Sequence, residues 1–206
     1  GGRERVSSSS FSSTKSIGIP SGLILSTGDA VDAQAGNPVE MSKKSTDIEG
    51  ADYTGSFNPL TVIEPESTRD LVLLEFYVKP ENSTLRADFV FASEDYEDVS
   101  SDYPNRACTD AKDKDRFGIF VSSYTSPSGT SVPETNLALW GDGSEISADS
   151  MYPSVIFACT SVRTDMYVPN EPGGSGQYKT SYDGFSLPLA GQTPVKPGEI
   201  YRVRLA

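Results

Sequence analysis

The stretch that decides the fold is LRADFVFASEDY, residues 85–96. Its apolar residues recur at every second position from Leu85 to Phe91, which is the period of a strand with one buried face. Acidic residues follow at once. A second apolar run, FGIFV at residues 117–121, comes after a loop that is again rich in aspartate. We therefore predict two core strands that pair with each other and are joined by a loop of carboxylates.

Further short apolar runs are bounded by turn residues along the rest of the chain. We expect a short buried strand at residues 23–25 and further strands at 71–78, 137–140, 155–158, 164–168 and 200–206. The glycine-rich turn at residues 141–143 is expected to end the strand at 137–140. The run at 71–78 has apolar residues at alternate and intervening positions, so we expect it to be buried on both faces. No long segment shows a helical period. The sequence predicts an all-β fold, either a sandwich or a jelly roll.

The chain has 206 residues, which suits one β domain. Residues 1–16 are rich in serine and predict a flexible arm, so the domain itself is expected to span residues 17–206. The last strand ends at Leu205 and Ala206 with no polar residue after it. This predicts an incomplete sheet whose missing strand comes from a partner chain, and the alternative is a trimmed chain.

The charge balance excludes several classes of partner. Seventeen basic residues stand against 29 acidic ones, for a net charge of −12. Nucleic acid and anionic membranes are bound through positive charge, so neither is expected as a partner. No apolar run approaches the roughly 20 residues that span a bilayer. The chain has no histidine, which removes Ser-His-Asp and Cys-His catalysis and the usual zinc ligands. We expect no enzymatic activity.

The chain contains two cysteines, Cys108 and Cys159. We expect one disulfide between them and an oxidising, extracellular compartment. The alternative is a pair of unbonded cysteines that act as small buried apolar residues.

Calcium is the expected cofactor because many acidic residues adjoin the predicted core strands. Calcium takes 6–8 oxygen ligands, which carboxylates in loops can supply. The candidate ligands are Glu94, Asp95, Asp98, Asp115, Asp29 and Asp183. The alternative is that these acids cap turns and solvate loops, as most surface carboxylates do.

Carbohydrate binding is the alternative function. Jelly-roll folds include lectins, in which exposed aromatic rings stack on sugars. The aromatic candidates are Tyr96, Tyr103, Trp140 and Tyr182. Trp140 lies in an apolar run and is expected in the core, whereas Tyr103 stands beside a proline and is expected to be exposed.

Several short motifs resemble one family when they are taken together and in order. They are GLILSTGDA (22–30), LLEF (73–76), FVFASEDY (89–96), DRFGIF (115–120), NLAL (136–139), YDGFS (182–186) and PGEIY (197–201). In this order they resemble the choice-of-anchor L domain of bacterial secreted and surface proteins. The family pattern also has strand sequence before residue 23 and after residue 205. Here a serine-rich arm replaces the first, and the second is missing.

The resemblance implies a non-catalytic extracellular β domain at a cell surface. We expect a structural or adhesive role in surface attachment or filament assembly. The expected partners are other copies of the chain, or another surface protein, bound by β-strand addition. The alternative is a calcium-dependent carbohydrate-binding module with a glycan as its ligand.

Overall fold

The computed structural model describes residues 8–12, 17–27, 30, 72–93, 115–124, 134–151, 163–170, 178, 180, 182 and 184–206. The chain divides into two compact units. The first is made of Gly1–Thr46, Phe89–Arg116 and Ile146–Leu189, and the second of Asp47–Asp88, Phe117–Glu145 and Ala190–Ala206. Within the described ranges, no helix has the length and apolar character to cross a membrane.

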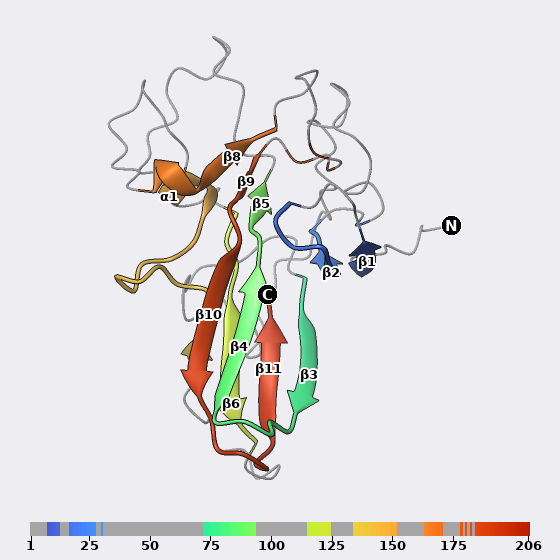
Figure 1. Ribbon diagram of the computed structural model, residues 1–206, viewed down its shortest axis with the longest axis vertical. Helices are drawn as coiled ribbons and strands as arrows, with labels where there is room; N and C mark the ends of the chain where they lie inside the picture. The colour runs from blue at the N-terminus through green and yellow to red at the C-terminus, as the bar shows by residue number, and fades with distance from the viewer. Residues whose placement is uncertain are drawn as a thin grey trace, which may run out of the picture. The chain divides into compact units, whose positions relative to one another are not determined.

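The second unit contains a four-stranded sheet with the order β3-β11-β6-β7 (Figure 1). Its strands are β3 (Leu74–Val78), β6 (Ile119–Ser123), β7 (Thr135–Asn136) and β11 (Tyr201–Leu205). All neighbours are antiparallel, and Val203 at the centre of β11 is paired with Phe76 on one side and Val121 on the other. Because paired residues share a face, these three apolar side chains lie on the same side of the sheet.

A two-stranded sheet of β4 (Thr84–Phe89) and β10 (Leu189–Pro194) belongs to the same unit except for its end residues Phe89 and Leu189. Figure 1 shows β4 and β10 side by side. Gly191 of β10 lies so close to Leu137 that a Cβ on the glycine would be 2.1 Å from the Leu137 carbonyl oxygen. This contact places β10 against the residue that follows β7. The arrangement is consistent with a β-sandwich, while a jelly-roll topology stays a prediction. The buried apolar residues of this unit are Ile119, Phe120, Val121, Leu137, Ala138, Trp140, Val195, Tyr201 and Val203.

The first unit contains two smaller antiparallel sheets. The three-stranded sheet has the order β5-β9-β8, with β5 at Ala92–Ser93, β9 at Gly184–Ser186 and β8 at Tyr167–Pro169. The two-stranded sheet pairs β1 (Ser8–Ser12) with β2 (Ser21–Leu25). A single turn of helix, α1 (Ala148–Met151), and a 3-10 turn, η5 (Thr164–Met166), complete the described elements. The buried apolar residues are Ala30, Phe89, Phe91, Ile146, Ala148, Met151 and Phe185.

The predicted all-β class is confirmed, but the predicted pairing of the two central strands is wrong. Strand β4 pairs with β10, and β6 pairs with β11 and β7. The alternation within residues 84–89 is as predicted, since Leu85 and Ala87 are half-buried between exposed neighbours and Phe89 is buried. Period two identifies a strand and its buried face, but it carries no information about which strand lies beside it.

Two predictions of burial are also wrong. Strand β3 was expected to be covered on both faces, yet Phe76 is 39% exposed and Tyr77 is 52% exposed. The run at residues 23–25 forms part of β2, but Leu23 is 51% exposed. A run of apolar residues predicts two buried faces only where other elements cover both, and that depends on tertiary packing.

The ends of the chain differ from expectation too. Residues 8–12 of the predicted serine-rich arm form β1, which supplies a strand before residue 23. The last strand, β11, has neighbours on both sides, β3 and β6, so it is an interior strand of its sheet. An unfinished edge at β11 is therefore excluded, and a partner strand would have to add elsewhere.

Of the remaining predicted strands, residues 137–140 follow β7 and contribute a single bridge, between Leu139 and Glu145. The segment 164–168 divides into η5 and the start of β8. Residues 155–158 lie outside the described ranges. The division of the chain into an arm and one domain over 17–206 stays a prediction.

Candidate functional site

Asp115 is the one predicted calcium ligand that the structure describes. Its Oδ2 accepts a hydrogen bond of 2.6 Å from Oγ of Ser93, which is fully buried at the end of β5. Ser93 directly precedes Glu94, so the contact brings Asp115 to the point where the acidic stretch begins. The sequence prediction that these two chain segments meet is supported at this one contact, although the strands themselves do not pair.

The environment of Asp115 disfavours its charged form. Neighbouring atoms desolvate the carboxyl group and raise its pKa, while the hydrogen bond from Ser93 acts in the opposite direction. The residue as a whole is exposed, while its carboxyl group is desolvated. A nearby cation would stabilise the negative charge of this carboxylate.

The other predicted calcium ligands, Glu94, Asp95, Asp98, Asp29 and Asp183, lie outside the described residues. Within the part of the chain that the structure describes, no group of three or more His, Cys, Asp or Glu side chains could hold a metal ion. Cys108 and Cys159 also lie outside it, so the disulfide stays a prediction.

One contact joins the segments that carry Asp29 and Asp183. The hydroxyl of Tyr182 donates a hydrogen bond of 3.0 Å to Oγ of Ser26. Nearby, Nδ2 of the buried Asn170 donates to the carbonyl oxygens of Thr180 and Tyr182, at 2.9 and 2.8 Å. Tyr182 is thus tied to Ser26, which follows β2, and also to Asn170, which follows β8.

A cluster around Glu134 in the second unit was missed by the sequence reasoning. Oε1 of Glu134 accepts a hydrogen bond of 2.9 Å from Nη2 of Arg202, and Oε2 accepts one from Nη2 of Arg204. The side chains of Glu134 and Arg204 are only 12% and 10% exposed. Both carboxylate oxygens are engaged by guanidinium groups, so this group is suited to holding the sheet together rather than to acting as a base.

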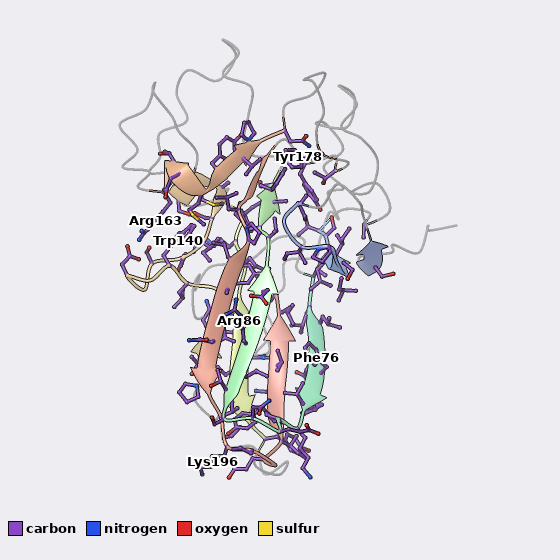
Figure 2. All side chains as sticks on the ribbon, in the orientation of Figure 1. Phe76, Arg86, Trp140, Arg163, Tyr178 and Lys196 are labelled. Carbon is purple, nitrogen blue, oxygen red and sulfur yellow. The ribbon has the colours of Figure 1, made fainter. Side chains whose placement is uncertain are left out.

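Strand β3 presents an aromatic edge in the second unit. The rings of Tyr77 and Tyr124 meet edge to face with centroids 5.0 Å apart, and Figure 2 shows Phe76 projecting from the same strand. The hydroxyl of Tyr77 donates a hydrogen bond of 3.0 Å to Oε1 of Glu75. This hydrogen bond to a carboxylate raises the pKa of Tyr77, because ionisation would place two negative charges side by side.

A hollow of about 290 Å³ lies between β6, β7 and the end of β10. Hydroxyl groups dominate its lining, which includes Ser122, Ser123, Thr135 and Thr193. Its charged residues, Lys196 and Glu199, form an ion pair of 3.3 Å with each other. Among the described residues, the hollow therefore offers hydrogen-bonding groups, and its two charged side chains are paired with each other.

The aromatic candidates for sugar stacking divide into two groups. Trp140 is buried, as predicted, with 8% of its surface exposed. Tyr182 is half-buried and uses its hydroxyl to bind Ser26. Tyr96 and Tyr103 lie outside the described residues, so carbohydrate binding stays a prediction.

Comparison with known proteins identifies the family. No curated protein and no solved structure matches this chain. The family described as the choice-of-anchor L domain matches residues 2–206. The match extends over both units and over the segment that forms β1. The chain therefore belongs to the choice-of-anchor L domain family, a family of surface-associated domains.

Proposed function

We propose that this protein is a non-catalytic, extracellular structural or adhesive domain that attaches or assembles by strand addition to its four-stranded sheet. One observation carries the proposal. Strand β3 is at the edge of that sheet, and among the described strands its one hydrogen-bonded neighbour is β11. An edge strand has a row of backbone N–H and C=O groups that another strand can satisfy.

The side chains of β3 support the same role. Phe76 and Tyr77 project from opposite faces of the strand, and both are substantially exposed. A sheet edge with apolar side chains favours pairing with another chain, since the added strand covers both the polar backbone and the apolar surface. Glu81 and Pro80 follow the strand and limit how far such pairing can extend.

Calcium is proposed as a stabilising ion of the first unit. The support is Asp115, whose desolvated carboxylate accepts a hydrogen bond from Ser93, the residue that precedes the acidic stretch. The proposed attachment role does not depend on the ion, because β3 belongs to the second unit.

Electron microscopy and light scattering of the native protein, without chelator, test the role. We expect ordered fibres or closed oligomers for the wild type, and their loss in the double variant Phe76→Lys, Tyr77→Lys. Leu139→Lys is the matched control, since Leu139 is similarly exposed at 37% but is not part of β3. Tyr77→Lys alone is the milder variant if the double variant melts at a lower temperature.

Dispersed single particles at every concentration would overturn the assembly role. In that case a glycan array with and without calcium becomes decisive, because a saturable sugar interaction lost in Tyr103→Ala would favour the carbohydrate-binding alternative.

A further inference from the structure

The charges on β3 are arranged symmetrically about Tyr77. Glu75 precedes this residue by two positions and Lys79 follows it by two. Alternation places all three side chains on one face of the strand, because Lys79 precedes Pro80 and is thereby held in an extended conformation. The chain carries a net charge of −12, yet residues 74–79 contain one acid and one base. This edge is therefore electrically neutral in a strongly acidic protein.

On the basis of the proposed function, we infer that the strand added to β3 is β3 of a second copy of this chain. The two strands run antiparallel about a two-fold axis that passes between the two Tyr77 residues. Glu75 of each copy then lies opposite Lys79 of the other, and Phe76 lies opposite Val78. Opposite charges and apolar pairs placed directly across two antiparallel strands both stabilise the pairing.

The alternative registers lack this complementarity. In a two-fold symmetric pair, the residue on the axis faces its own copy. Centring the pair on Glu75 puts two carboxylates opposite each other, and centring it on Val78 puts Glu75 opposite Glu81. Centring it on Phe76 leaves Glu75 opposite Tyr77. Among registers centred within β3, the one through Tyr77 pairs both charges.

The same register extends both faces of the existing sheet. Tyr77 is paired with Arg202 and Phe76 with Val203, so the first pair belongs to the polar face and the second to the apolar face. Two four-stranded sheets joined at β3 form one continuous sheet with an uninterrupted apolar side. Because two chains of net charge −12 repel each other, a contact that is itself neutral adds no further repulsion to self-association.

Sedimentation equilibrium of charge-reversal variants tests the inference. Glu75→Lys turns both symmetric contacts into Lys–Lys pairs, and Lys79→Glu turns both into Glu–Glu pairs. We expect each variant to raise the dissociation constant of the dimer roughly tenfold or more, since two attractive pairs become repulsive. An equal mixture of the two variants restores both contacts, and so does the double variant. Native mass spectrometry with one of the two variants uniformly labelled with nitrogen-15 identifies the mixed dimer by its intermediate mass.

The change in net charge separates the effect of a specific contact from that of general repulsion. Glu75→Lys makes the chain less acidic, so general repulsion falls and association would strengthen if no specific contact existed. The control is Asp165→Lys, which changes an exposed acid outside β3 by the same charge. Glu75 and Lys79 are both exposed, so melting temperatures near that of the wild type are expected throughout.

The outcomes separate this inference from the proposed function. A wild type that assembles through β3 but is unaffected by the charge reversals would overturn the symmetric register and leave the attachment role standing. Open fibres without a dimeric unit would do the same. A wild type that is monomeric at every concentration would overturn this inference together with the assembly role, and would leave attachment to a different surface protein as the form of the proposed function.

Discussion

Ser93 and Asp115 are joined by a 2.6 Å hydrogen bond across 22 positions of sequence. Ser93 is the last residue of β5, so the bond ties Asp115 to the end of this strand. A hydroxyl donor stabilises the ionised carboxylate, whereas desolvation of the same carboxyl group opposes ionisation. A further charge close to the carboxyl group of Asp115 would therefore change its pKa.

The pH dependence of stability should reveal this environment. The pKa of Asp115 is raised above its ordinary value of 3.8 because burial of the carboxyl group disfavours the charge. The folded protein therefore binds this proton more tightly than the unfolded chain does. The resulting stabilisation is complete below pH 3.8 and is lost as the pH rises through the raised pKa.

We therefore expect the free energy of unfolding of the wild type to fall, relative to that of Asp115→Asn, as the pH rises through this window. Chemical denaturation with chelator present measures the difference between the two proteins. A difference that stays constant with pH would show that Asp115 has the same pKa in the folded and unfolded states.

Calcium should stabilise the ionised form of the Asp115 carboxylate, which desolvation alone disfavours. If it binds at the acidic stretch, a concentration of about 100 times the dissociation constant stabilises the protein by about 2.7 kcal/mol. For a chain of this size the melting temperature should rise by roughly 5 to 10 °C. Differential scanning calorimetry with calcium and with excess chelator measures the shift. Asp115→Asn should reduce it and Glu81→Gln should not, whereas equal melting temperatures with and without chelator would rule out the site.

The cluster around Glu134 should contribute strongly to stability. Glu134→Ala leaves the buried guanidinium of Arg204 without its carboxylate, at a cost of about 3 to 5 kcal/mol in the free energy of unfolding. The control is Asp88→Ala, which removes an exposed contact of 2.7 Å with Arg86 and should leave stability close to that of the wild type. Denaturant titration compares the two. A similar loss in both variants would contradict a special role for the buried cluster.

The packing of β10 should not tolerate a side chain at Gly191. A Cβ there would be 2.1 Å from the carbonyl oxygen of Leu137 and 2.8 Å from its carbonyl carbon, so the backbone must move. We expect Gly191→Ala to lower the free energy of unfolding by about 1 to 3 kcal/mol or more. Gly141→Ala is the control, since nothing lies within 4 Å of a Cβ at that position. Wild-type stability in Gly191→Ala would mean that the two sheets are farther apart.

The predicted disulfide can be tested by comparing single and double variants. If Cys108 and Cys159 are bonded, either serine substitution removes the bond and should lower the free energy of unfolding by about 2 to 5 kcal/mol. The double variant should then lose about as much as either single variant. Independent, additive effects of the two substitutions would indicate unbonded cysteines.

Much of the fold could be predicted from residue patterns. The period of two identified β4 and β11, and the glycine-rich turn at residues 141–143 was also predicted. In that turn Gly143 has a φ of 84°, a conformation that favours glycine, and its N–H donates to the carbonyl oxygen of Trp140. These features depend on neighbours a few residues away, so local sequence is sufficient to predict them.

The candidate site could be predicted only in part. Asp115 was identified because it stands next to an apolar run, and the structure gives it a partner that precedes the acidic stretch. Glu134 was missed because its partners lie 68 and 70 residues away, and no pattern near Glu134 indicates them. Arg202 and Arg204 alternate with apolar residues in the strand predicted at 200–206, a pattern that does not reveal that Arg204 is buried at 8% exposure.

The sequence by itself determined the all-β class, the position of most described strands, the burial of Trp140 and the family. Only the tertiary structure decided that β4 and β6 have different partners, that β11 is an interior strand and that β3 is at an edge. The physical reason is the range of the interactions. Side-chain alternation and turn conformation are set within a few residues. Strand neighbours and the covering of a face arise from contacts between segments far apart in the chain, which many arrangements of the same strands could provide.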